Sequence, residues 1–139
     1  MRILVVDDNA EFLKAARFLL RQLGHEPVGL ARAGDEGLAL AAGLRPDVAL
    51  VEVEPPGMAG LETVARMRRC EAGFPVVAIT CSHDAGVHRQ CLEAGCAGFI
   101  PKGDLASDLP RILARLAGIH VQQTTARANS IAALECADV

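Results

Sequence analysis

The stretch Ile3-Leu4-Val5-Val6-Asp7-Asp8 places two adjacent aspartates directly after four apolar residues. A second stretch, Val48-Ala49-Leu50-Val51-Glu52, also ends in an acid, which here is a glutamate. An uninterrupted apolar run of this length is typical of a strand buried on both faces of a sheet. Ligands of parallel α/β sheets bind at the carboxyl ends of the strands. We therefore expect the three carboxylates to meet at one edge of a parallel sheet.

The rest of the chain repeats this alternation of a short apolar run with a longer stretch of helical spacing. The expected strands cover residues 3–6, 27–30, 48–53, 76–80 and 98–100. The expected helices cover residues 12–23, 35–42, 61–68, 84–94 and 109–116. This alternation predicts an α/β sandwich with helices on both faces of a parallel sheet. Residues 118–139 break the pattern, and we expect a linker or C-terminal tail there, with one short helix over residues 126–136 as the alternative.

Composition limits the function classes. The 139 residues fit one domain, and the core must be aliphatic because the chain has no Trp or Tyr. The net charge is −3 and no Lys/Arg cluster occurs, so a nucleic-acid or membrane surface is not expected. No apolar run approaches the roughly 20 residues of a membrane span, and we expect a cytoplasmic protein. The five cysteines lack a Cys-x-x-Cys spacing, which argues against a zinc site or a disulfide framework.

Two more polar residues follow predicted strands, Thr80 after the fourth and Lys102 after the fifth. Taken singly, each has an ordinary explanation, and Asp8 or Asn9 can simply cap the first helix. Together, carboxylates, a hydroxyl and an ammonium at one edge suit phosphoryl chemistry. Carboxylate oxygens are ligands for Mg²⁺, and fixed positive charges stabilise a transferring phosphoryl group.

Several motifs, in their order and spacing, resemble the response-regulator receiver domain, the CheY-like module of two-component signalling. They lie at residues 3–9, 46–60, 77–80 and 94–102. The resemblance covers about residues 1–117, which we take as the domain. It implies a flavodoxin-like (CheY-like) three-layer sandwich, with a five-stranded parallel sheet in the order 2-1-3-4-5 and five helices. The ending Gly98-Phe99-Ile100-Pro101-Lys102 resembles receivers that precede helix-turn-helix output domains.

The resemblance implies a metal site and a phosphoacceptor. Asp8 would hold Mg²⁺ directly and Asp7 through water. Position 52, here Glu52, would be the phosphoacceptor and a further metal ligand. The backbone carbonyl of Glu54 would complete the protein ligands.

The resemblance also implies a switch. Thr80 would hydrogen-bond one phosphoryl oxygen, and Lys102 would neutralise another. Phe99 would be the aromatic residue that turns inward as Thr80 moves. The output surface would comprise the fourth helix, the fifth strand and the fifth helix.

Glu52 departs from the family, which has aspartate at this position. The extra methylene moves the carboxylate, and a shift of about 1 Å can cost in-line transfer about a hundredfold. We therefore predict that small phosphodonors modify the chain poorly or not at all. Three consequences stay open: Glu52 partly mimics the phosphorylated state, another ligand or partner sets an interaction platform, or regulation is lost. For Mg²⁺, the alternatives are weak binding or none, with Lys102 paired to the acids instead.

We interpret the chain as a signal-transduction receiver domain that acts by switching a protein-interaction surface, and not as an enzyme. One alternative is an ordinary phosphoryl-accepting receiver with a divergent site. Another is an aspartate-nucleophile phosphatase, whose signature separates its two aspartates by one residue, whereas Asp7 and Asp8 are adjacent. The expected partners are a sensor histidine kinase or an output domain, without direct nucleic-acid contact. A homodimer through the output surface is a further expectation.

Overall fold

The computed structural model describes residues 1–55, 57–70 and 73–118. The strands are β1 (Arg2–Val6), β2 (Glu26–Ala31), β3 (Val48–Glu52), β4 (Val76–Thr80) and β5 (Gly98–Pro101). The helices are α1 (Ala10–Gln22), α2 (Gly34–Leu44), α3 (Leu61–Arg68) and α4 (Ala85–Glu93), followed by the 3₁₀ turn η1 (Lys102–Asp104). A C-terminal helix covers residues 105–118. The predicted tail helix at residues 126–136 lies outside the described residues.

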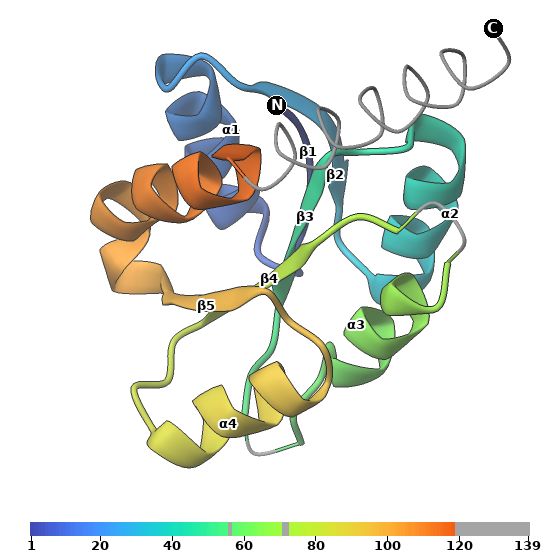
Figure 1. Cartoon of the computed structure of the whole chain (residues 1–139), viewed down its shortest axis with the longest axis vertical. Coiled ribbons are helices and arrows are strands. Elements are labelled where there is room, and N and C mark those ends of the chain that lie inside the picture. Colours follow the sequence, from blue (N-terminus) through green and yellow to red (C-terminus); the bar gives the residue numbers. More distant parts are fainter. Residues whose placement is uncertain (56, 71–72, 119–139) are drawn as a thin grey trace, which may run out of the picture.

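The expected fold class is confirmed. All neighbouring strands are parallel, and their order is β2-β1-β3-β4-β5. Figure 1 shows the sheet between two layers of helices, with α1 beside the C-terminal helix and α2 near α3. Most predicted boundaries lie within two residues of the observed ones. The last helix begins four residues earlier than predicted. The 3₁₀ turn η1 leads directly into it at Leu105, which is buried in the same cluster as Leu109 and extends the helical spacing by one turn.

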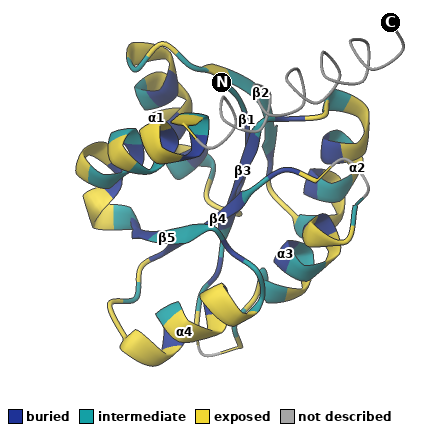
Figure 2. Ribbon diagram, viewed as in Figure 1, coloured by how far each residue is buried: buried dark blue, intermediate teal, exposed yellow. Residues whose placement is uncertain are grey.

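The core consists of two aliphatic layers, one on each face of the sheet. Leu4 and Val6 point into the layer beneath α2, α3 and α4, while Ile3 and Val5 point into the layer beneath α1 and the C-terminal helix. This alternation is the two-residue period of a strand, and both faces are apolar because both are covered. Figure 2 shows the buried strands at the centre and the exposed residues on the outer surfaces of the helices.

The register brings the carboxyl ends of the strands to one edge. Val6 pairs with Val51, and Glu52 pairs with Ile79 on β4. Thr80 pairs with Pro101, directly before Lys102. The chain direction is the same in every strand. The residues that follow β1, β3, β4 and β5 therefore lie at the same edge of the sheet.

Gly60 lets the chain turn back onto β3 at this edge. Its φ is +102°, in the left-handed region, and a Cβ there would overlap the carbonyl oxygen of Glu52. The N–H of Val64 donates to the carbonyl oxygen of Gly60 at 2.9 Å and starts α3. Glycine is therefore required by both conformation and space. Among the described residues, no helix is long and apolar enough to cross a membrane.

We expect Gly60→Ala to lower the free energy of unfolding by about 2 kcal/mol or more, because the methyl group meets backbone at a positive φ. Gly43→Ala is the matched control. Gly43 lies on the exposed side of α2, with open space where a Cβ would be. Alanine there should raise the free energy of unfolding by about 0.5–1 kcal/mol. Urea unfolding of the two variants measures both effects, and equal stabilities would contradict this account of Gly60.

Candidate functional site

The turn after β1 holds the two aspartates in different environments. Asp7 is 1% exposed, and its Oδ1 accepts the backbone N–H of Asn9 at 2.8 Å. Asn9 is the N-cap of α1, and its side chain accepts from the backbone N–H groups of Glu11 and Phe12. Asp8 is exposed and is free of the capping role. The helix therefore begins in a way that buries one carboxylate and leaves the other at the surface.

Lys102 reaches into this edge from the end of β5. Its Nζ lies 2.7 Å from Asp7 Oδ2 and 3.0 Å from Glu52 Oε1. The ammonium also lies 4.7 Å from the ring centroid of Phe12, within cation–π range. Burial opposes the charged form, but the hydrogen bonds and charges of Asp7 and Glu52 outweigh it and raise the pKa of Lys102 to about 12. Lys102 is therefore charged at neutral pH and is the cation that compensates the buried carboxylate.

Both oxygens of Glu52 have partners within the chain. Oε1 accepts from Lys102, and Oε2 accepts the backbone N–H of Asp8 at 3.2 Å. The longer side chain thus folds back toward the end of β1. The alternative in which Lys102 pairs with the acids agrees with this geometry.

The donor set nevertheless fits Mg²⁺. Oxygens of Asp7, Asp8 and Glu52 lie within 4.8 Å of one another, and hard carboxylate oxygens suit this ion. Three carboxylates and one ammonium leave the cluster with net negative charge, which attracts a divalent cation. Lys102 pairs with two of these carboxylates, so a bound cation would have to share Asp7 and Glu52 with it.

Glu54 has its carboxylate turned toward the β4–α4 loop. Its Oε1 accepts the backbone N–H of Cys81 at 2.7 Å and lies 4.0 Å from Lys102 Nζ. Burial raises the pKa of the Cys81 thiol, and the charge and hydrogen bond of Glu54 raise it further. The sequence assigned a role only to the backbone carbonyl of Glu54, so this side-chain contact was missed.

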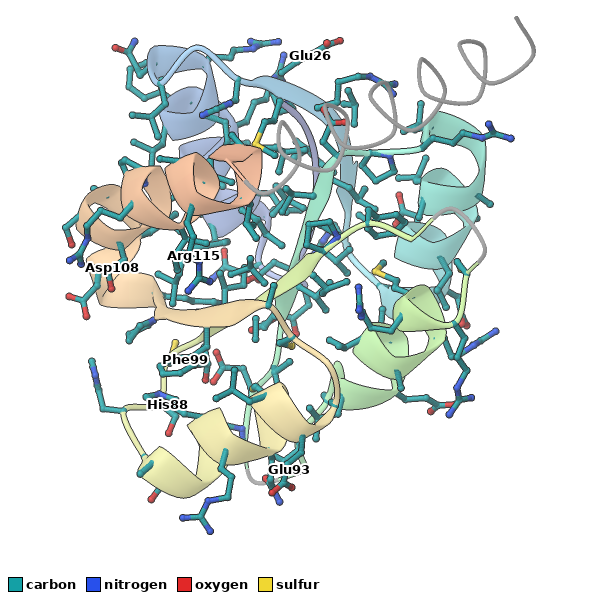
Figure 3. All side chains as sticks on the ribbon, viewed as in Figure 1. Glu26, His88, Glu93, Phe99, Asp108 and Arg115 are labelled. Carbon is teal, nitrogen blue, oxygen red and sulfur yellow. The ribbon has the colours of Figure 1, made fainter. Side chains whose placement is uncertain are left out.

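Thr80 and Phe99 lie further along the sheet. Thr80 is fully buried, and its Oγ1 accepts the backbone N–H of Ser82 at 3.1 Å. Among the residues that the structure describes, no hydrogen bond joins Thr80 to Glu52. The half-buried Phe99 stacks on His88 of α4 with ring centroids 3.8 Å apart, and Figure 3 shows the two side chains together. His88 was also missed, because no sequence periodicity links a residue of α4 with one of β5.

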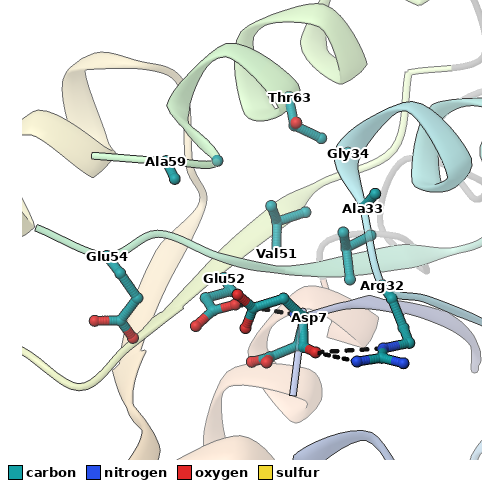
Figure 4. Close-up of a pocket in the computed structure, with 12 residues that line it drawn as sticks. Asp7, Arg32, Ala33, Gly34, Val51, Glu52, Glu54, Ala59 and Thr63 are labelled. Carbon is teal, nitrogen blue, oxygen red and sulfur yellow. Dashed lines mark hydrogen bonds between the residues drawn. The ribbon is translucent and has the colours of Figure 1, made fainter. Parts of the chain in front are cut away.

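A cleft of about 240 Å³ opens beside the carboxylates (Figure 4). Arg32 lies at its edge, and its guanidinium donates twice to the carbonyl oxygen of Asp8, at 3.2 and 3.3 Å. Thr63 and Gly34 line the opposite side. Arg32 directly follows β2, so its position at the carboxyl edge could be predicted from the strand order. Its contact with the carbonyl oxygen of Asp8 could not.

A family model described as the response regulator receiver domain matches residues 3–132. The chain belongs to this family. Response regulator GacA of Pseudomonas viridiflava is 36% identical over 104 residues, which are 74% of this chain and 49% of that protein. A protein-glutamate methylesterase/protein-glutamine glutaminase of Geobacillus kaustophilus is 33% identical over an alignment of 135 residues that covers 92% of this chain and 38% of the relative. The receiver chain therefore spans about half or less of these relatives.

Solved receiver structures agree. The signal receiver domain of a modulated diguanylate cyclase from Desulfovibrio desulfuricans G20 superposes with a TM-score of 0.73 at 28% identity, covering 88% of this chain and 96% of that one. A LuxR-family two-component response regulator from Aurantimonas sp. SI85-9A1 gives a TM-score of 0.74 at 28% identity, covering 84% and 85%. The relatives are mostly response and transcription regulators, although one is named as an esterase.

We expect Lys102→Met to tighten Mg²⁺ binding by about tenfold or more, because it removes a positive charge that competes for Asp7 and Glu52. Lys14→Met, on the exposed side of α1, is the matched control and should leave the affinity unchanged. Isothermal titration calorimetry with MgCl₂ measures the difference. Equal affinities in the two variants would show that Lys102 does not compete with the cation.

Proposed function

We propose that this receiver domain controls a protein-interaction surface without accepting a phosphoryl group at position 52. The observation that carries the proposal is the state of Glu52, whose two oxygens are held by Lys102 and by the backbone N–H of Asp8. A nucleophile needs a free, correctly aimed oxygen. The glutamate is both longer than an aspartate and engaged on each oxygen, so attack on a phosphodonor is disfavoured twice.

The other acidic residues of the site are assigned to metal binding. Asp7 and Asp8, with Glu52 and the carbonyl of Glu54, are the proposed metal ligands, and Mg²⁺ binding is weak. Bound Mg²⁺ would supply charge neutralisation at the carboxylates.

The geometry favours a fixed ion pair over full mimicry of a phosphorylated site. Glu52 contacts Lys102, but the Thr80 hydroxyl accepts from Ser82 instead. A single carboxylate also carries less charge than a phosphoryl group, which has about two negative charges. We infer that Thr80, Phe99 and Lys102 remain the switch elements, and that a partner rather than phosphorylation sets them.

The partners that this function requires are proteins. We propose a sensor histidine kinase or an output domain, engaged through α4, β5 and the C-terminal helix, with homodimerisation through the same face. The relatives that this chain half covers include a putative transcriptional regulator of Pseudomonas aeruginosa, 33% identical over 108 residues. An output domain of that kind would make any DNA contact, and the receiver itself would make none.

Incubation with Mg²⁺ and acetyl phosphate, followed by intact-mass spectrometry, tests the proposal. We expect no phosphoryl adduct on the wild type and one adduct on Glu52→Asp, because the shorter side chain withdraws from Lys102 and from the Asp8 N–H. Glu62→Asp, an exposed substitution on α3, is the matched control and should stay unmodified.

An adduct on the unaltered chain would reject phosphorylation independence. If neither the wild type nor Glu52→Asp were modified, the glutamate at position 52 would not be what prevents phosphorylation, and this part of the proposal would be wrong.

A further inference from the structure

The side chain of Glu54 joins the ends of two neighbouring strands. Glu54 follows β3, whereas Cys81, whose backbone N–H it accepts, follows β4. The N–H···O distance of 2.7 Å lies at the short end of the range, as expected for a donor bound to a charged oxygen. Lys102 Nζ lies 4.0 Å from the same oxygen, at the sheet edge. The contact is therefore a strong attachment of the β4–α4 loop to β3.

The attached loop leads to the proposed output face through consecutive contacts. Ser82 follows Cys81, and its N–H donates to Thr80 Oγ1. The carbonyl oxygen of Ser82 accepts from His88 Nε2 at 3.0 Å. A carbonyl can only accept, so the proton of this contact lies on Nε2.

The path ends at Phe99. The His88 ring lies against the Phe99 ring at 3.8 Å with an interplanar angle of 23°. The hydrogen bond to Ser82 therefore orients the His88 ring, which packs against the half-buried Phe99 of β5. Figure 3 shows His88 and Phe99 side by side above α4.

We propose that Glu54 is a positioning residue whose carboxylate holds the β4–α4 loop, and through Ser82 and His88 sets the position of Phe99. Glu52 cannot serve in this way, because its oxygens bind Lys102 and the Asp8 N–H. The inference rests on the proposed function in one respect: the loop is set by a carboxylate of the chain itself instead of a phosphoryl group.

Solution NMR on the full chain, with Glu54→Ala and Glu54→Gln, tests this path. In Glu54→Ala, the Cys81 amide should exchange with solvent about tenfold faster or more, as the loss of a charge-assisted hydrogen bond implies. The Phe99 ring signals should shift in the same variant, because the stack on His88 loosens. Glu54→Gln keeps the volume and an acceptor oxygen but not the charge, and should give intermediate values for both.

Two matched variants locate the effect. Glu62→Gln, on the exposed face of α3, should change neither signal. His88→Ala should shift the Phe99 signals while the Cys81 amide stays protected, because it breaks the path beyond the loop. A change of either signal in Glu62→Gln would overturn the proposal that Glu54 acts on Phe99 through the loop. Faster Cys81 exchange or unshifted Phe99 signals in His88→Ala would overturn it as well.

Unchanged Cys81 exchange and Phe99 signals in Glu54→Ala would overturn the proposal, and so would an equal response in Glu52→Gln. These readouts need no phosphodonor. Phosphorylation of the wild type would reject the proposed function while the NMR results still report on Glu54, so the two failures can be told apart.

Discussion

The ion pairs of the Lys102 ammonium hold the strand ends together at the carboxyl edge of the sheet. It lies between a fully buried carboxylate, Asp7, and the partly buried Glu52, at 2.7 and 3.0 Å. A buried carboxylate without a compensating charge is strongly destabilising, so the strand end that carries Asp7 needs this partner. Burial alone would favour the neutral amine, yet the two carboxylates raise the pKa of Lys102 to about 12 and keep it charged. The ends of β1, β3 and β5 are thus joined by one cation.

This arrangement divides two tasks between two glutamates. Glu52 neutralises Lys102 and turns toward β1, while Glu54 turns the other way and holds the loop after β4. Both contacts are made by carboxylates of the chain itself. The site therefore has a defined arrangement without a phosphoryl group. Under the proposed function, regulation falls to protein partners on the α4–β5 side.

The sequence patterns predicted which segments are buried, but not where individual side chains point. Continuous apolar runs such as Ile3–Val6 report burial on both faces, so the sheet and its polar edge were predictable, as was the gathering of Asp7, Asp8 and Glu52. The resemblance supplied the strand order. Side-chain direction was not available: Glu54 turns to Cys81, and His88 stacks on Phe99, through rotamers and inter-element packing that no local period records. The pairing of Lys102 with the acids was one of two alternatives, and only the distances favour it.

Lys102 and Glu52 form an ion pair within the folded chain, with 3.0 Å between Nζ and Oε1. A double-mutant cycle on the free energy of unfolding, with Glu52→Gln, Lys102→Met and the double variant in metal-free buffer, measures that pair directly. Both side chains are less than one fifth exposed, at 18% and 15%, so solvent screens the pair only in part. The account predicts a favourable coupling energy of about 1–3 kcal/mol. A coupling energy near zero would contradict it, because the carboxylate at position 52 would then be free of Lys102.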